Sequence, residues 1–260
     1  MQCRAVERQR LPRLPTTALH GALGHVLKHL APGLASTEAQ GGGEGVTNYA
    51  PTSLVLRPGA FEAEGDCLRL EAGAALEFEL VLIGKDAMSQ VAAACAAAGV
   101  ALERGLALPG KGPRPALKLE EVRWSEDGPL RPVPEQARVT WLSPARLTSS
   151  GRPAEEFDEA LLWRSMRRRA ETLCAAYGGV MPSLEEAPGF DIDDGASWIV
   201  DVGRYSTRQA QHMKWPGLVG WLDLRVKSDA AARLLAFSER VGLGKGTSFG
   251  CGQFKTERWG

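Results

Sequence analysis

The sequence predicts an α+β protein with two ferredoxin-like (RRM-like) domains in tandem and a glycine-rich loop near the C-terminus. Strand-like and helix-like segments follow one another in the order of a βαββαβ unit, and this order partly repeats along the 260 residues. Pro129, Pro132 and Pro134 lie between the two sets and are typical of a linker. A chain of this length can bury two modest cores. We therefore expect residues 1–134 and 135–260 to form separate domains.

The first half contains two segments with helical character. In Thr16–Leu30 apolar residues recur every three or four positions, and Pro32 follows soon after. The alanine-rich segment Ala87–Ala98 is expected to be a helix that ends at Gly99. Residues 36–48 include three consecutive glycines and predict a mobile loop. Strands are expected at Ser53–Leu56, Cys67–Leu70, Ala75–Ile83 and 116–124.

The second half repeats this pattern around a longer helix, Asp158–Tyr177. Pro182–Gly195 is acidic and lacks periodicity, so we expect it to be an exposed insertion. Strands are expected at Val139–Leu142, Ser197–Val202, Leu218–Val226 and Phe249–Thr256, with a further helix at Ala230–Val241.

Composition and cysteine spacing exclude several classes of protein. A hydrophobic content of 44% and a charged content of 24% are ordinary for a globular protein. No apolar run reaches the roughly 18 residues of a membrane-spanning helix, and the charged N-terminus is no signal peptide, so a cytoplasmic location is expected. No metal site or cofactor is expected, because the histidines lie apart from any cysteine pair and the cysteines are scattered at Cys3, Cys67, Cys95, Cys174 and Cys251.

Charge is balanced overall but unevenly distributed. The chain has 31 Lys and Arg against 31 Asp and Glu. Residues 1–30 carry five basic and one acidic side chain, residues 196–260 carry ten and five, and residues 154–195 carry four and ten. A cationic surface formed where the two ends meet would hold a polyanion.

The segment Val241–Phe254 is the strongest local signal for phosphate binding. Its glycines permit positive φ and close backbone approach, so that N–H groups can converge on a phosphate. It is not a P-loop, because a strand-like segment follows it instead of a helix. A purely structural glycine-rich turn fits the composition equally well. The candidate residues are Gly242, Gly244, Lys245, Gly246, Thr247, Ser248, Gly250 and Gly252.

A second candidate segment, Arg204–Gly220, mixes cations with Tyr205 and Trp215. Such mixtures can hold phosphates while aromatic rings stack on bases. The alternative is a solvated strand–turn–strand. The candidate RNA-binding residues are Arg204, Arg208, Gln209 and Lys214.

The first expected helix carries residues suited to proton transfer. His25 and His29 are four residues apart and share a face, and Lys28 is a neighbouring cation that could stabilise a phosphorane. His20 lies on the same helix. Surface histidines without a chemical role are the alternative. The arginines at positions 164 and 167–169 are interpreted as a solvated helix face rather than as a nucleic-acid contact.

Taken in order, these segments resemble the CRISPR repeat-processing endoribonucleases of the RAMP superfamily, the Cas-six family, over nearly the whole chain. LHGALGHVLKHL is similar to that family's first helix, VTWLSPARLT to the strand that opens its second half, and FDEALLWRSMRRRAETLCAAYGG to its long helix. RYSTRQAQHMKWPGLVGWLDL is similar to a family segment in which an Arg-Gln pair precedes Gly-Leu-Val-Gly. GLGKGTSFGCGQF is similar to the C-terminal glycine-rich loop that defines the superfamily.

The resemblance implies a metal-independent endoribonuclease that cleaves precursor CRISPR RNA within the repeat. A ribose 2′-hydroxyl attacks the adjacent phosphate and leaves a 2′,3′-cyclic phosphate and a 5′-hydroxyl. The family usually supplies a histidine from near the first helix; here His20 stands where arginine is common, and no histidine follows the helix. The expected acid/base residue is therefore His29, then His25, then His20, with Lys28 as cationic stabiliser and Tyr49 as an orienting phenol.

Two other functions are open. A non-cleaving subunit of a CRISPR effector complex would bind the repeat RNA through the glycine-rich loop and the basic segments, without cleaving it. A metabolic enzyme with a phosphate-binding loop would need a substrate-specific acid/base set, which the chain does not offer.

Overall fold

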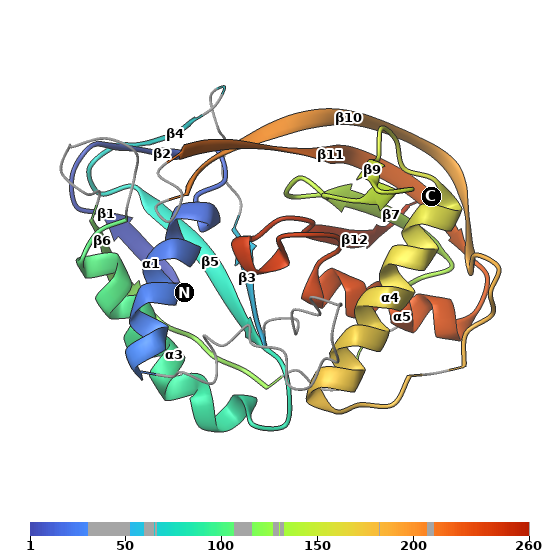
Figure 1. The fold of residues 1–260 in the computed structure, drawn as a ribbon, viewed down its shortest axis with the longest axis horizontal. Helices are drawn as coiled ribbons and strands as arrows, with labels where there is room; N and C mark the ends of the chain where they lie inside the picture. Colours follow the sequence, from blue (N-terminus) through green and yellow to red (C-terminus); the bar gives the residue numbers. More distant parts are fainter. Residues whose placement is uncertain are drawn as a thin grey trace.

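The computed structural model describes residues 1–30, 53–59, 65, 67–106, 116–126, 130, 133–181, 183–206 and 211–259. Within them, each half of the chain forms a four-stranded antiparallel sheet packed against a pair of helices (Figure 1). The predicted α+β class is confirmed.

In the first half, the four strands of the main sheet and the two helices follow one another in the order βαββαβ. Its sheet has the strand order β3-β5-β1-β6, and a two-stranded ladder of β2 and β4 is added beside it. Apolar residues of α1 and α3 pack with the sheet in one cluster that runs from Cys3 to Leu117. The elements are β1 (Gln2–Ala5), β2 (Gln9–Pro12), α1 (Thr16–Leu30), β3 (Leu54–Pro58), β4 (Cys67–Leu70), β5 (Ala75–Leu82), α3 (Ala87–Glu103) and β6 (Leu117–Glu121).

The second half repeats this order with longer strands. Its sheet has the strand order β10-β11-β7-β12, and a second apolar cluster runs from Val133 to Phe254. The elements are β7 (Gln136–Trp141), β8 (Thr148–Ser149), β9 (Arg152–Pro153), α4 (Glu159–Tyr177), β10 (Phe190–Ser206), β11 (Gln211–Val226), α5 (Asp229–Val241), a 3-10 turn η1 (Thr247–Phe249) and β12 (Phe254–Arg258).

Local chemistry explains where the helices of the second half begin. The Asp158 side chain accepts a hydrogen bond from the Leu161 N–H at 2.7 Å, and Ser228 caps α5 by accepting from the Ala231 N–H at 3.2 Å. α4 ends at Gly178, whose φ of 80° is readily adopted only by glycine. No helix of the described residues is long and apolar enough to cross a membrane.

The predicted bounds of two elements, α3 and the last strand, are wrong. α3 continues through Gly99 to Glu103, because burial of Ala98, Ala101 and Leu102 outweighs the cost of about 1 kcal/mol for a helical glycine. The last strand begins at Phe254 rather than at position 249, since the glycines before it turn the chain. The predicted loop at residues 36–48 lies outside the described residues.

The acidic segment Pro182–Gly195 is only partly irregular, and its prediction as an exposed insertion is wrong for its second part. Residues from Phe190 onward belong to β10 and pair with β11. Asp191 forms an ion pair with Lys227 at 2.6 Å, and Asp193 pairs with Arg225 on the neighbouring strand. The acidic residues therefore neutralise basic residues across the ladder, a pairing that periodicity within one segment does not reveal.

A buried thiol in the first sheet has a measurable consequence for stability at high pH. Cys3 is 0% exposed and its Sγ donates to the Leu76 carbonyl at 3.1 Å; burial raises its pKa from 9.0 to about 12. Between these two values the unfolded state loses the proton and the folded state keeps it. Stability is therefore expected to fall as pH rises from 9, by up to about 1.4 kcal/mol per pH unit from this group. Urea unfolding of wild type and Cys3→Ala between pH 8 and pH 10.5 measures it; equal slopes for both proteins would contradict it.

Candidate nucleic-acid interface

The glycine-rich segment Gly242–Gly252 forms a tight turn between α5 and β12. Its five predicted glycines all have positive φ, between 69° and 85°. A Cβ at Gly252 would lie 1.8 Å from the Leu243 carbonyl oxygen, and one at Gly244 would lie 2.7 Å from the Arg146 carbonyl oxygen. Glycine is thus needed at these positions, because any side chain would clash with neighbouring backbone atoms. This is the role expected of a structural glycine-rich turn.

Part of this turn still presents backbone donors. Lys245, Phe249, Gly250, Cys251 and Gly252 each donate an N–H to a carbonyl of the protein. Within the described part of the chain, the N–H groups of Gly246, Thr247 and Ser248 have no such acceptor. These three consecutive donors lie beside Lys245, whose side chain is exposed. Consecutive backbone N–H groups without a protein acceptor are able to bind phosphate oxygens.

The same segment contacts the other half of the protein through α1. The close approach is made at Gly250, where a Cβ would lie 2.2 Å from the Thr16 Oγ1. His20 follows one turn later on α1, and its Nδ1 lies 2.8 Å from the Ser248 carbonyl oxygen. The His20 ring also packs on Phe249 with ring centroids 3.6 Å apart. We call these contacts of α1 with the glycine-rich segment the junction.

The hydrogen bond to Ser248 defines the chemistry available to His20. A carbonyl oxygen can only accept, so in the neutral imidazole the proton is assigned to Nδ1. Nε2 is then the basic nitrogen of the ring. A histidine held in this tautomer is arranged to accept a proton at Nε2.

Aromatic packing supports the junction from the second half. The Trp215 ring meets Phe249 edge-on with centroids 5.2 Å apart, and the Arg146 guanidinium lies 4.2 Å from the Trp215 ring centroid. Leu14 of the first half packs with Trp215 and Cys251 in a small apolar cluster. Because Trp215 is only 8% exposed, it stabilises the junction, and its interpretation as a base-stacking side chain is wrong.

The other predicted residues are distributed differently. His25, Lys28 and His29 are exposed on α1, and the two histidine rings meet edge-on with centroids 5.8 Å apart. Within the described residues neither of these histidines makes a hydrogen bond or ring contact with the glycine-rich segment. Lys214 is exposed on β11. Arg204 lies on β10. The remaining candidates, Tyr49, Arg208 and Gln209, lie outside the described residues.

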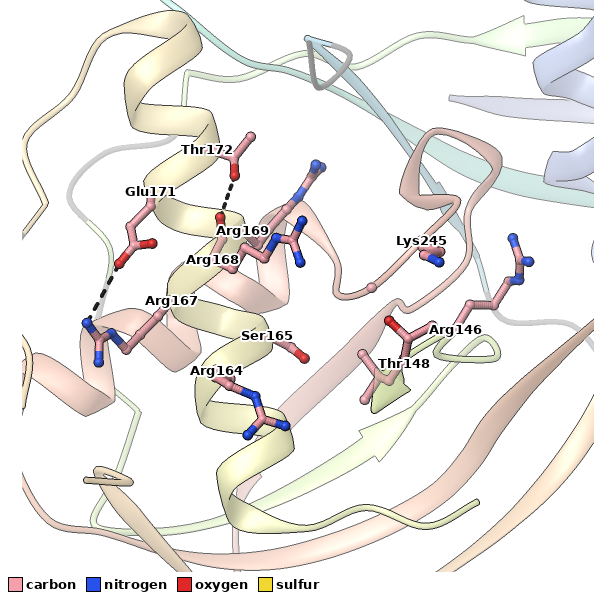
Figure 2. A pocket seen from close by; sticks show the side chains of 12 residues that line it. Arg146, Thr148, Arg164, Ser165, Arg167, Arg168, Arg169, Glu171, Thr172 and Lys245 are labelled. Carbon is pink, nitrogen blue, oxygen red and sulfur yellow. Dashed lines mark hydrogen bonds and ion pairs between the residues drawn. The ribbon is translucent and has the colours of Figure 1, made fainter. Parts of the chain in front are cut away.

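The structure also assembles a basic cavity that sequence reasoning missed. It has a volume of about 590 Å³ and lies between α4 and the glycine-rich segment (Figure 2). The arginines of α4, interpreted from sequence as a solvated helix face, line it together with Arg146 and Lys245. The spacing of Arg164 and Arg168 by four residues indicates one shared helix face, but the partners of that face come from distant segments.

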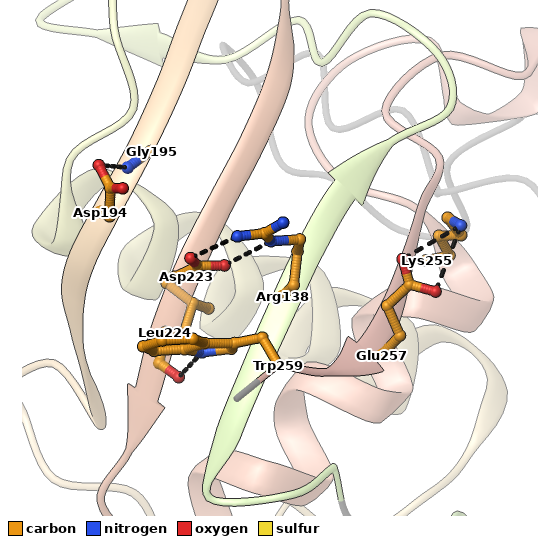
Figure 3. A network of polar contacts seen from close by, with 8 residues as sticks. All are labelled: Arg138, Asp194, Gly195, Asp223, Leu224, Lys255, Glu257 and Trp259. Carbon is orange, nitrogen blue, oxygen red and sulfur yellow. Dashed lines mark hydrogen bonds and ion pairs between the residues drawn. The ribbon is translucent and has the colours of Figure 1, made fainter.

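Several basic residues on the second sheet are, in contrast, paired. Arg138 makes two hydrogen bonds to the buried Asp223, at 2.6 and 2.7 Å (Figure 3). Its guanidinium also lies over the Trp221 ring, 4.4 Å from the ring centroid. Lys255 pairs with Glu257 at 3.3 Å on the adjacent strand. This pairing leaves less positive charge for a polyanion on the sheet than at the cavity. Among the described residues, no three His, Cys, Asp or Glu side chains come together as a metal-binding group.

The fold and the junction define an α+β protein of two βαββαβ halves, joined through a helix-borne histidine and a glycine-rich turn. Residues 139–254 match the model of the family described as CRISPR-associated endoribonuclease Cas6. This match covers most of the second half of the chain. A search of curated protein sequences found no match.

Solved Cas6 structures share the fold over nearly the whole chain. A Cas6 product complex, with the protein from Thermus thermophilus, is 19% identical with a TM-score of 0.64, and 98% of each chain is covered. A Cas6 substrate mimic complex is 17% identical with a TM-score of 0.56, covering 98% of this chain and 97% of the other. A Cas6-related protein of Pyrococcus furiosus is 11% identical with a TM-score of 0.58 over the same shares.

Proposed function

We propose that this protein is a metal-independent endoribonuclease that cleaves precursor CRISPR RNA within the repeat. The observation that carries the proposal is the junction, where His20 is held against the glycine-rich segment with Nε2 as its basic nitrogen. The family match and the solved Cas6 complexes with product and with a substrate mimic support RNA as the ligand.

The proposed reaction needs only groups that the chain supplies. Nε2 of His20 accepts the proton of a ribose 2′-hydroxyl as its oxygen attacks the adjacent phosphorus. The N–H groups of residues 246–248 and the Lys245 ammonium stabilise the charge that develops on the non-bridging oxygens. The bond to the 5′ oxygen then breaks, and that oxygen takes up a proton from water. The protonated His20 returns its proton to the solvent, so no net proton is gained or lost. The products are a 2′,3′-cyclic phosphate and a 5′-hydroxyl.

His29, His25, Lys28 and Tyr49 remain predictions for this chemistry. His25, Lys28 and His29 lie on the exposed face of α1. A substrate bound along that face would bring them to the RNA, with Lys28 as the cation. The rank of His20 above His29 rests on its contact with the glycine-rich segment.

A second candidate function is a non-cleaving subunit that holds repeat-derived RNA. One observation favours it: the hydrogen bond to Ser248 and the packing on Phe249 would also suit a histidine whose role is only to dock the two halves. Such a protein would keep the basic cavity and the glycine-rich turn without catalysing cleavage.

The test is incubation of the purified protein with its own repeat RNA in excess EDTA, beside an RNA with a single 2′-deoxy nucleotide at the cut. We expect cleavage in EDTA, a 2′,3′-cyclic phosphate on the product, and no cleavage of the 2′-deoxy RNA, because the nucleophile is then missing. Tight binding of both RNAs without cleavage would favour the non-cleaving subunit instead. Cleavage that requires added Mg²⁺ would overturn the proposed mechanism.

A further inference from the structure

The basic cavity described above is surrounded by six cationic side chains and one carboxylate. α4 contributes most of them, and the loop after β7 and the glycine-rich turn contribute the rest (Figure 2). The single acid, Glu171, pairs with Arg167 at 3.7 Å. The cations are Arg146, Arg164, Arg167, Arg168, Arg169 and Lys245.

Three of these cations have no partner in the described part of the chain. The side chains of Arg164, Arg168 and Lys245 are exposed and make no hydrogen bond or ion pair with the described residues. Arg164 and Arg168 are one helical turn apart, about 6 Å along the axis, so each can reach a different anionic group. In Figure 2 the Lys245 and Arg146 side chains lie across the cavity from α4.

The two deeper arginines are poorly neutralised as well. Arg169 donates one N–H to the Val241 carbonyl at 3.2 Å, while its Nε has no partner within the described residues. The Arg146 Nε is also without a hydrogen bond there. Burial lowers the pKa of both guanidinium groups, that of Arg169 to about 10. A bound anion would offset this cost of burying positive charge.

The cations at the cavity differ from several cations of the second sheet, which are neutralised by acidic residues. Arg138 on β7, Arg225 on β11 and Lys227 just after β11 each contact an aspartate. The cavity instead concentrates arginines whose planar guanidinium groups match the oxygens of a phosphate. Its volume of about 590 Å³ exceeds that of a surface dimple and lies in the range of ligand pockets.

We propose that this cavity is a second RNA subsite, which holds backbone phosphates of a repeat-RNA segment other than the one cut at the junction. The proposal rests on the proposed function, because it takes repeat RNA as the ligand. Arg164 and Arg168 bind phosphates from α4, Arg146 and Lys245 bind from the opposite wall, and Lys245 links the cavity to the glycine-rich turn. The subsite sets affinity and the position of the RNA, and it takes no part in the proton transfers.

The experiment measures binding of 2′-deoxy-blocked repeat RNA in EDTA at several KCl concentrations. The test variant is Arg164→Ala with Arg168→Ala. The matched control is Arg233→Ala with Arg258→Ala, which removes two exposed arginines of α5 and β12 that do not line the cavity. Both variants lose the same charge, and alanine favours the helical positions on α4 and α5. Thermal melting checks that both are folded.

For the test variant we expect at least a 10-fold weaker Kd at the lowest salt and a flatter plot of log K against log salt. The slope should decrease in magnitude by about 1.4, since each lost phosphate contact on single-stranded RNA contributes about 0.7. The control variant should keep the wild-type slope. Equal slopes and affinities for the two double variants would overturn the subsite, as would failure of the wild type to bind the RNA.

Cleavage of unblocked RNA separates this proposal from the proposed function. Cleavage of unblocked RNA by the wild type is therefore measured beside the binding of all three proteins. If the wild type binds RNA without cleaving it and the test variant still has a flatter plot of log K against log salt, the subsite is supported and the proposed nuclease function is contradicted. If the wild type cleaves and the test variant binds as the control does, the nuclease stands and the subsite falls.

Discussion

Replacement of His20 by glutamine is expected to lower the rate of repeat-RNA cleavage at saturating RNA by about 10²–10⁴-fold, the usual contribution of a general acid or base. A glutamine amide can still donate to the Ser248 carbonyl, so the contact between α1 and the glycine-rich segment is retained. It cannot accept a proton near neutral pH. Single-turnover rates between pH 5.5 and pH 9, together with the Kd for blocked RNA, measure the effect.

The matched variants are His25→Gln and His29→Gln on the exposed face of α1. If His20 is the base, both should retain rates within a few-fold of wild type, and only His20→Gln should lose the pH dependence attributable to an imidazole. A purely structural His20 would instead show normal cleavage by His20→Gln. Loss of cleavage in His29→Gln alone would establish the helix-end histidine that the sequence ranked first.

Replacement of Gly250 by alanine is expected to destabilise the protein by about 2–4 kcal/mol and to abolish cleavage. At φ 85° a side chain costs about 1–2 kcal/mol of backbone strain. The new Cβ would also lie 2.2 Å from the Thr16 Oγ1 and 2.8 Å from the Thr16 Cβ, a clash of the kind that costs about 1–3 kcal/mol. Relief of this clash requires α1 and the turn to move apart, which separates His20 from Ser248. Urea unfolding and single-turnover cleavage measure the two effects.

Gly246→Ala is the control, because it has nearly the same φ without the clash. Gly246 has a φ of 81°, and its Cβ would meet nothing nearer than the Cys251 Sγ at 3.4 Å. The Gly246→Ala protein should therefore lose only the stability that corresponds to the backbone strain, and it should keep much of its cleavage activity. Thr16→Gly combined with Gly250→Ala should recover part of the cleavage lost in Gly250→Ala. Equal loss in Gly246→Ala and Gly250→Ala would show that strain in the turn matters and the approach to α1 does not.

The elements with strong local patterns could be predicted from sequence. Thr16–Leu30 has the bounds expected from its apolar spacing, and α4 begins one residue after the Asp158 cap. Local patterns failed where distant residues decide the outcome. Gly99 did not end α3, because the buried alanines beside it pack against the first core. The segment with Asp191 and Asp193 was predicted to be irregular, because the sequence does not show that Lys227 and Arg225 pair with these aspartates.

The candidate site shows the same division. The sequence indicated the histidine-bearing helix and the glycine-rich segment, but helical spacing alone does not say which histidine faces a residue far along the chain. It also gave no sign that Arg146 and Lys245 lie across a cavity from the α4 arginines. The histidine assignment depends on how the two halves pack, and the cavity depends on how distant segments of the second half pack. Residue roles at the junction and in the cavity therefore remain predictions for the experiments above.

The bond between His20 and Ser248 joins residues 228 positions apart. A contact of such long sequence separation carries a large entropic cost of loop closure. We therefore expect it to form late in folding, after local helices and strands have formed and can offset that cost. Each half can acquire its own core first, and the proposed nuclease site appears only when the halves dock. Nascent or partly unfolded chains would therefore be unable to cut RNA. A mutation deep in either core can silence the protein without touching a residue that meets the substrate.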